Sequence, residues 1–366
     1  MKKLGLTITV LLIAIPTYLL LANTSTTDKF QTPTFPNEKT TQQGNYGAEF
    51  VVAKNLRIPW AIAFLPSGDL LLTQREGQIL FIDRGFDSRP EKIADISSVK
   101  AVGEGGLMGI TTNPNFNQNH YVYLYYTYSA STDETLNRVS KFIFEGQSLK
   151  DEKVIVDKIP GATNHNGGRI KFGPDGFLYI GTGDAQNPSL AQNKNSLAGK
   201  ILKVTNEGKP APGNPFNNEV YSYGHRNVQG LSWDDQGNLW ATEHGSSAND
   251  ELNKIERGGN YGWPQITGSQ TRNGIISPII NSGSDTWAPS GLAFYKGSFY
   301  FVGLKGASLF KYDPGSSSLS KFFEEKYGRI REAVAGPGGA LYIITNNTDG
   351  RGSPKSEDDK LIRLSL

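Results

Sequence analysis

The chain has 366 residues, of which 37% are hydrophobic and 11% aromatic, and it contains no cysteine. This apolar content is sufficient for a large packed core, which excludes an intrinsically disordered chain. The absence of cysteine excludes disulfides, thiolate metal sites and thiol nucleophiles. Lys and Arg number 37 against 35 Asp and Glu. This balance argues against nucleic acid as a partner, because nucleic-acid-binding surfaces carry a basic excess.

Residues 1–22 have the features of an export signal. Lys2 and Lys3 are the only charged residues there, and an almost wholly apolar run of about 19 residues follows. This pattern predicts a secretory signal peptide, with an uncleaved membrane anchor as the alternative, since the run is just long enough to cross a bilayer. Residues 23–45, polar and rich in Thr, Gln and Pro, predict a flexible tether. In either case we expect the folded domain, residues 46–366, to work in the periplasm or cell envelope.

A sequence motif is repeated along the chain from residue 46 onward. Short β-rich runs alternate there with turns of Gly, Pro, Asn and Asp, which predicts an all-β fold. An apolar residue, a turn and a strand of aliphatic and aromatic residues recur six times, starting at residues 64, 112, 172, 233, 294 and 335. The spacings of 41 to 61 residues, with four short strands per unit, are typical of β-propeller blades.

The six units predict a six-bladed β-propeller that forms one domain without an internal linker. A strand at residues 49–52 precedes the first complete unit. We expect it to complete the blade that contains residues 361–364, which closes the ring and leaves no open sheet edge. Because this fold hosts binding proteins as well as enzymes, function has to be argued from the loops at one mouth of the central channel.

Four loop segments combine polar side chains with glycines. The first is Asn-His-Asn-Gly-Gly-Arg, which places His165 on an open backbone from which it can face a ligand. Imidazole titrates near neutral pH, so His165 is the best candidate for a general base among the four histidines. We expect His120 at the surface, and His225 and His244 are candidates for hydrogen-bonded core residues.

The second and fourth segments supply cations. In Tyr-Gly-His-Arg-Asn, Arg226 and Asn227 offer a planar cationic fork and an amide, which suit a carboxylate or quinone oxygen. A salt bridge between blades is the structural alternative. In Tyr-Gly-Arg-Ile-Arg-Glu, Arg329 and Arg331 alternate, so an extended strand places both guanidinium groups on one side. Without carboxylates beside them they suit an anionic ligand, and plain solvent exposure is the alternative.

The third segment is a Gly-rich acidic loop at residues 243–251, followed by Gly-Gly-Asn-Tyr-Gly-Trp-Pro at residues 258–264. Carboxylates and exposed carbonyl groups are the ligands that Ca²⁺ prefers. The spacing is not that of an EF-hand. The sequence therefore indicates a calcium loop of another kind.

Together these segments resemble the soluble quinoprotein sugar dehydrogenases, the six-bladed propellers of the glucose, aldose sugar and sorbosone dehydrogenase group. The motifs match in order across residues 46–366, and their combination is highly specific. The resemblance implies binding of pyrroloquinoline quinone (PQQ), a tricarboxylate, through Ca²⁺, and oxidation of the anomeric hydroxyl of an aldose sugar to a lactone. Which sugar, which electron acceptor, and monomer or homodimer stay open.

The resemblance also implies roles for individual residues. His165 would take the hydroxyl proton as hydride passes to the quinone. Arg226 and Asn227 would polarise the quinone oxygens. The carboxylates of the cofactor would be held by three cations: Lys305, Arg329 and Arg331.

Two calcium sites are implied in the same way. The main-chain carbonyls of Gly245 and Ser246 would hold the cofactor calcium; the family often has Pro at the second position, where Ser serves equally because only the carbonyl is used. Glu251 and the carbonyl of Tyr261 resemble the ligands of a second, structural calcium. Trp287 falls where the family lines the cofactor and sugar pocket.

Glu104 departs from the family pattern, which has Gln at this position of the cofactor-binding segment. A carboxylate beside an anionic cofactor is repelled unless it pairs with Arg or takes up a proton; contact with a sugar hydroxyl is another option. Two other hypotheses therefore stay open. A calcium-dependent lactonase, which also occurs on six-bladed propellers, gives the four cations no role. A non-catalytic binding propeller is supported by Glu104.

Overall fold

The computed structural model describes residue 1 and residues 48–86, 89–132 and 134–366. Apart from Met1, the predicted signal or anchor and the tether therefore lie outside the described residues. Within the described part of the chain, no helix is long and apolar enough to cross a membrane. From residue 48 onward the chain belongs to one compact unit built from six four-stranded antiparallel sheets. The predicted six-bladed β-propeller is confirmed.

Each sheet is one blade, described here from its innermost strand outward. Blade 1 contains β2 (Pro59–Phe64), β3 (Leu70–Gln74), β4 (Gln78–Ile82) and β5 (Glu91–Asp95), and blade 2 contains β6 (Leu107–Thr112), β7 (Tyr121–Ser129), β8 (Thr135–Glu145) and β9 (Ser148–Pro160). Blade 3 contains β10 (Ile170–Phe172), β11 (Leu178–Gly181), β12 (Lys200–Val204) and β13 (Val220–Tyr223), and blade 4 contains β14 (Val228–Trp233), β15 (Leu239–Glu243), β16 (Glu251–Ile255) and β17 (Ile280–Asn281). Blade 5 contains β18 (Pro289–Tyr295), β19 (Ser298–Gly303), β20 (Leu309–Asp313) and β21 (Ser318–Phe322), and blade 6 contains β22 (Ile330–Gly336), β23 (Ala340–Thr345), β24 (Leu361–Leu364) and β1 (Glu49–Ala53). The helices of the described residues are single turns: α1 (Phe116–Asn119), α2 (Ser189–Gln192) and the 3₁₀ turn η1 (Pro337–Gly339).

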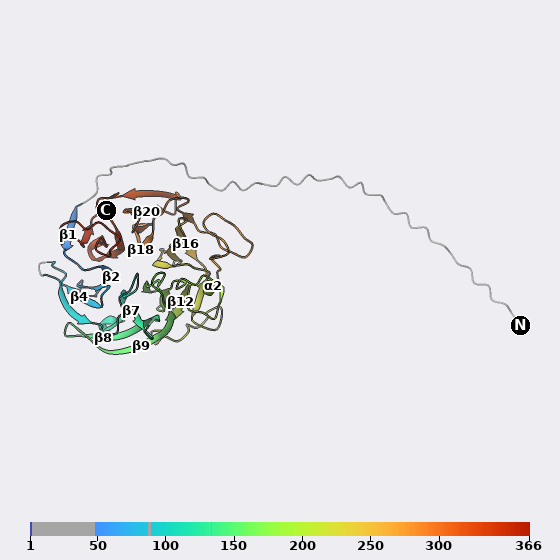
Figure 1. Cartoon of the computed structure of the whole chain (residues 1–366), viewed down its shortest axis with the longest axis horizontal. Coiled ribbons are helices and arrows are strands. Elements are labelled where there is room, and N and C mark those ends of the chain that lie inside the picture. The colour runs from blue at the N-terminus through green and yellow to red at the C-terminus, as the bar shows by residue number, and fades with distance from the viewer. Residues whose placement is uncertain (2–47, 87–88, 133) are drawn as a thin grey trace. The chain divides into compact units, whose positions relative to one another are not determined.

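The innermost strands form a closed ring around the central axis. Each of β2, β6, β10, β14, β18 and β22 contacts the next, and β22 contacts β2 again, as the arrangement of the blades in Figure 1 shows. The motif that recurs in the sequence lies at the same place in every blade, the turn between the innermost and the second strand. The repeat was visible because this hairpin is a local structure with its own turn residues.

The N-terminal strand closes the ring as predicted. β1 pairs antiparallel with β24, with Glu49 opposite Leu364 and Val51 opposite Ile362. The last blade therefore contains strands from both ends of the domain. β24 therefore has a paired neighbour on each side, and β1 is the outermost strand of this blade.

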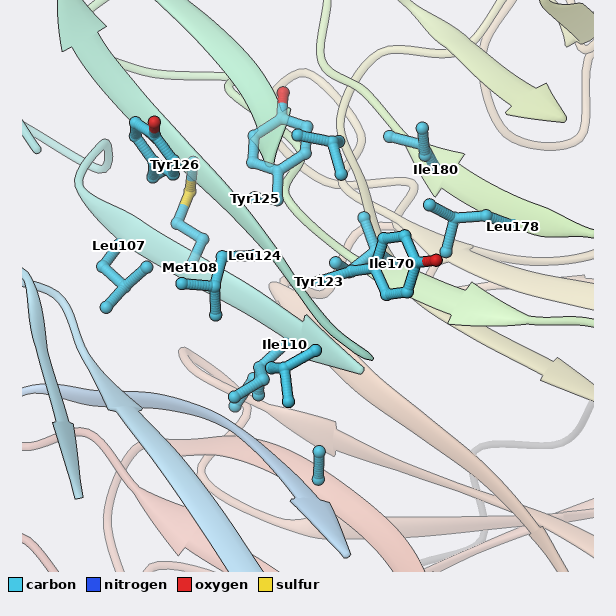
Figure 2. Packing of buried hydrophobic residues seen from close by; sticks show 14 of the residues in the cluster. Leu107, Met108, Ile110, Tyr123, Leu124, Tyr125, Tyr126, Ile170, Leu178 and Ile180 are labelled. Atoms are coloured by element: carbon cyan, nitrogen blue, oxygen red, sulfur yellow. The ribbon is translucent and has the colours of Figure 1, made fainter. Parts of the chain in front are cut away.

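Cores between neighbouring blades stabilise this cysteine-free domain. In β7, residues 122–127 are buried without interruption, because the blade is covered on both faces by its neighbours. Figure 2 shows side chains of blades 2 and 3 packed against one another. They are Leu107, Met108, Ile110, Tyr123, Leu124, Tyr125, Tyr126, Ile170, Leu178 and Ile180.

Candidate functional site

Strand order places the sequence-predicted residues at one end of the propeller. In an antiparallel blade, the turn between the first and second strands lies at one end, and the second-to-third and blade-to-blade connections lie at the other. The recurrent turns occupy the first end. The segments around Glu104, His165, Arg226, Trp287 and Arg329 are blade-to-blade connections, and those around Gly245 and Lys305 join second and third strands. All of them therefore belong to the opposite mouth.

Glycines let the His165 loop lie against the end of β11. His165 itself has a positive φ of 62° and Gly167 one of 64°, a left-handed region that glycine adopts without strain. A Cβ on Gly183 would lie 1.9 Å from the carbonyl oxygen of His165. Only glycine fits at position 183, so the backbone of His165 is held directly against the segment that carries Asp184.

His165 is oriented by a buried carboxylate. Its Nδ1 lies 2.8 Å from Oδ1 of Asp184, which is fully buried. The other oxygen, Oδ2, accepts a hydrogen bond from the Trp263 indole at 2.8 Å. The His165 side chain keeps 19% of its surface exposed, and its Nε2 has no hydrogen bond within the described residues. One ring nitrogen is fixed and the other is free, which is the arrangement of a general base.

Asp184 and Trp263 were missed by the sequence analysis. Asp184 follows β11, and the carboxylate of Glu243 ends β15, the corresponding strand of the next blade. His165 and Asp184 are 19 residues apart, and His225 and Glu243 are 18 apart. This near-equal offset in consecutive repeats is the signal that would have pointed to Asp184.

Arg226 and Asn227 present hydrogen-bond donors without acceptors. The amide Oδ1 of Asn227 accepts the N–H of Gly167 at 2.9 Å, whereas its Nδ2 is buried and has no partner among the described residues. The Nε of Arg226 is buried and unpartnered in the same way. The Arg226 guanidinium lies 5.3 Å from the centre of the Trp263 ring. Buried donors of this kind are costly unless a ligand supplies acceptors.

Arg329 and Arg331 have different surroundings. Arg331 is almost fully buried and donates to the neutral side-chain oxygens of Gln229 at 2.8 Å and Asn346 at 3.0 Å. Burial lowers the pKa of Arg331 to about 9, against the opposite effect of Asp349 and with a smaller contribution from the charge of Arg329. Arg329 is paired with Asp349 at 2.8 Å, so the expectation that neither arginine has a carboxylate beside it is wrong for Arg329. Its Nε is nevertheless buried without a partner in the described chain.

Lys305 and Trp287 belong to neighbouring loops of blade 5. The Lys305 side chain is exposed and forms no ion pair with any described residue. The preceding carbonyl, of Leu304, accepts a hydrogen bond from Arg329 at 3.3 Å, which brings the loop of Lys305 to the arginines. Trp287 is only 5% exposed and its ring packs against Phe310 in the core of the blade. Its role as a pocket wall stays a prediction.

Glu104 lies among the cations, and it is paired. Its Oε2 accepts the backbone N–H of His165 at 3.0 Å, and its Oε1 accepts a hydrogen bond from Arg351 at 2.6 Å. Burial alone would raise the pKa of Glu104, but the charges of His244 and Arg351 and the two hydrogen bonds lower it to about 2. The pairing with arginine that the sequence analysis required of this carboxylate is present, through a residue that the sequence did not suggest.

The acidic loop has one feature that suits a cation. A cavity of about 20 Å³ is lined by Gly245, Glu251 and Tyr261, among others, which is room for about one water molecule or ion. Burial and the neighbouring charge of Glu243 raise the pKa of Glu251 to about 8. Within the described ranges, no group of three or more His, Asp or Glu side chains could hold a metal. A calcium ion here would therefore depend mainly on main-chain carbonyls, with at most one or two carboxylates; the predicted ligands, the carbonyls of Gly245, Ser246 and Tyr261 and the side chain of Glu251, are of this kind.

Comparison with known proteins identifies the family. The profile of the glucose/sorbosone dehydrogenases matches residues 56–363. The aldose sugar dehydrogenase YliI of Escherichia coli is 30% identical over 339 residues, which are 82% of this chain and 90% of the relative. The quinoprotein glucose dehydrogenase B of Acinetobacter calcoaceticus is 31% identical over 261 residues, which are 61% of this chain and 54% of the relative.

A solved structure agrees with the sequence relatives. The PQQ-bound aldose sugar dehydrogenase of Streptomyces coelicolor is 40% identical and superposes with a TM-score of 0.82. The match covers 87% of this chain and 98% of the other. The chain belongs to the glucose/sorbosone dehydrogenase family. The predicted resemblance and the prediction of an enzyme of the oxidoreductase class are thereby confirmed, whereas the roles of the individual site residues stay predictions.

Proposed function

We propose that this protein oxidises an aldose sugar at its anomeric hydroxyl to the lactone, with PQQ and Ca²⁺ as resident cofactors. The observation that carries the proposal is the meeting of two kinds of group at one mouth of the ring. One is His165, with Nδ1 held by Asp184 and Nε2 free. The other is a set of buried donors on Arg226, Asn227 and Arg329 that lack acceptors within the described part of the chain.

The residues present fit a flat polyanion. Arg331 has only neutral acceptors, Lys305 is unpaired among the described side chains, and the Nε atoms of Arg226 and Arg329 are free. Arg329, Arg331 and Lys305 would hold the carboxylates of the cofactor, and Arg226 and Asn227 would donate to its quinone oxygens. A tricarboxylate would supply the acceptors that these buried donors lack. The carbonyls of Gly245 and Ser246 would hold the cofactor calcium, and Glu251 and Tyr261 a structural one.

The residues of the chain then perform the acid–base part of the reaction. When bound, PQQ supplies the two-electron acceptor for the hydride that leaves the anomeric carbon. His165 accepts the hydroxyl proton at Nε2, so that the C–O bond gains double-bond character as the C–H bond breaks. Asp184 keeps Nδ1 protonated and stabilises the imidazolium that forms. A general base in this position contributes about 10²- to 10⁴-fold in rate.

Titration of the purified protein with PQQ and CaCl₂ tests the proposal. We expect a change in the absorbance spectrum of the quinone, a rise in melting temperature, and dye-linked oxidation of aldoses. An unchanged spectrum and melting temperature at saturating PQQ would contradict it. Binding without turnover would favour the non-catalytic propeller, and hydrolysis of lactones by cofactor-free protein would favour the lactonase.

The N-terminal sequence supports a location outside the cytoplasmic membrane, with residues 1–22 as a cleaved signal or an anchor. Cell fractionation followed by N-terminal sequencing of the mature protein distinguishes the two. A mature chain that begins near residue 23 in the soluble envelope fraction indicates cleavage. An intact N-terminus in the membrane fraction indicates an anchor.

A further inference from the structure

Arg351 connects three loops across the mouth of the site. It lies between β23 and β24 of blade 6. Its Nη1 donates to Oε1 of Glu104 at 2.6 Å, and its Nη2 donates to Oδ1 of Asn164 at 3.0 Å. These acceptors are 247 and 187 residues away in the sequence. One guanidinium group therefore links the last blade to the connection before β6 and to the connection that carries His165.

Glu104 is attached to the backbone on both sides of Asn164. Its N–H donates to the carbonyl of Thr163 at 2.7 Å, and its carboxylate accepts the N–H of His165 at 3.0 Å. The backbone around the proposed general base thus depends on where Glu104 lies. Because Arg351 holds both Glu104 and Asn164, it fixes this arrangement from the far side of the mouth.

Glu104 also introduces a negative charge where the proposed function needs positive charge. Its charge acts to raise the pKa values of Arg75, Arg226 and Arg331. Its side chain is only 18% exposed. An ionised carboxylate at this place repels an anionic ligand unless a cation opposes it. Arg351 is the side chain that forms an ion pair with it in the described chain.

The loop that carries Arg351 is anchored to Arg329, one of the proposed cofactor-binding cations. Asp349 accepts the backbone N–H of Arg351 at 2.9 Å through Oδ1, and its Oδ2 pairs with Arg329 at 2.8 Å. The Asp349 side chain is buried, whereas that of Arg351 keeps 47% of its surface exposed. The guanidinium of Arg351 is therefore placed by a buried anchor and not by its own burial.

We propose that Arg351 is a positioning residue that keeps this site suited to an anionic cofactor. Its guanidinium neutralises Glu104 and, through Glu104 and Asn164, holds the backbone of His165. The inference rests on the proposed function for the identity of the anion, PQQ. It assigns to one exposed arginine both the charge balance of the site and the placement of the general base.

A double-mutant cycle tests whether Arg351 neutralises the charge of Glu104. We expect Arg351→Met to weaken PQQ binding at least tenfold, because Glu104 then loses its ion-pair partner and its negative charge acts more strongly on the anionic cofactor. Glu104→Gln keeps an oxygen that accepts the His165 N–H and removes the negative charge, so we expect a PQQ affinity above that of the wild type. The double variant should return to within about threefold of the wild-type Kd, because both charges are gone. Kd is measured by absorbance titration in CaCl₂, and the melting temperature of each variant checks folding.

The positioning part has a separate readout. Glu104→Ala combined with Arg351→Met removes the acceptor of the His165 N–H as well as both charges. We expect PQQ affinity as in the Glu104→Gln/Arg351→Met variant, but a kcat at saturating PQQ that is about three- to tenfold lower. Equal kcat values would overturn the assignment of Glu104 as the support of His165.

Lys54→Met is the matched control. Lys54 pairs at 2.5 Å with Glu357, which is in the same loop as Arg351. The substitution therefore removes an exposed ion pair from that loop and leaves the contacts of Glu104 in place. Its Kd should be unchanged. Unchanged affinity in Arg351→Met, or a double variant as weak as Arg351→Met, would overturn the inference while the proposed function stands. Failure of the wild-type protein to bind PQQ would overturn the proposed function and this inference with it.

Discussion

Two histidine–carboxylate pairs occupy corresponding places in consecutive blades, and only one of them is open. His165 precedes β10 and meets Asp184 after β11, and His225 precedes β14 and meets Glu243 at the end of β15. In both pairs Nδ1 lies 2.8 Å from the carboxylate. The Nε2 of His225, however, is bonded to Ser222 Oγ at 2.8 Å, and its ring is fully buried and stacked on Tyr261. His225 is thus a satisfied core residue, as expected.

The difference between the two pairs is one of access and not of pairing. The closed pair has no nitrogen left for a substrate, but its carboxylate also holds the backbone of the next residue, since Oε2 of Glu243 accepts the N–H of Arg226 at 2.9 Å. The closed pair therefore places a proposed cofactor ligand, and the open pair offers a base. A histidine–carboxylate contact alone does not distinguish a candidate general base from a structural histidine; a general base also needs an accessible second nitrogen.

The largest effect is expected from His165→Ala. The variant should lose about 10²- to 10⁴-fold in kcat, or about 3–5 kcal/mol of transition-state stabilisation, because the proposed acceptor of the hydroxyl proton is gone. Its PQQ affinity and melting temperature should change much less, because the buried carboxylate of Asp184 keeps the hydrogen bonds from the Trp263 indole and the Gln186 N–H. Steady-state kinetics at saturating cofactor measure this. Retention of wild-type kcat would remove His165 from the mechanism.

For His225→Ala we expect the main loss in stability, and not in kcat. It leaves the buried carboxylate of Glu243 and the hydroxyl of Ser222 without their shared partner, which should cost about 2–4 kcal/mol of unfolding free energy. Urea unfolding of the apo-protein measures the loss. If this variant is as stable as the wild type but inactive, the two pairs have been assigned the wrong way round.

Asp184→Asn tests the support of the open pair. We expect kcat to fall about 10- to 100-fold, or about 1.4–2.7 kcal/mol, because an amide does not stabilise the imidazolium. The control is Asp234→Asn: Asp234 also accepts an indole N–H, from Trp240 at 3.1 Å, but lies far from the mouth in the recurrent turn of blade 4. Equal losses in both variants would point to general destabilisation and not to a role beside His165.

The smallest effect concerns calcium next to the closed pair. Tyr261, which stacks on His225, lines the small cavity with Glu251. Ca²⁺ should raise the melting temperature of the apo-protein by about 2–6 °C, and excess chelator should reverse this. In Glu251→Gln the rise should fall below about 1 °C, because the proposed carboxylate ligand is gone. An undiminished rise in this variant would exclude Glu251 as a ligand.

The sequence alone determined the architecture, because the information is local. Each blade begins with a hairpin whose turn residues and β-rich strands recur, so six units, an all-β fold and the closure by residues 49–52 could be read directly. The mouth of the propeller followed from the positions of the motifs between strands. The family also followed, because its motifs are short and lie in contiguous segments.

The tertiary structure alone decided which groups face each other across the ring. Asp184, Trp263 and Arg351 were not found, because their contacts with the site join segments from 19 to 247 residues apart. His165 and His225 sit in similar local settings of amides and glycines, and the sequence did not show that Ser222 would close the His225 imidazole. The second partner of His225, Ser222, lies only three residues away. Which carboxylate each ring meets, and how deeply the ring is buried, are set by the packing of strands and neighbouring blades, which no single segment specifies.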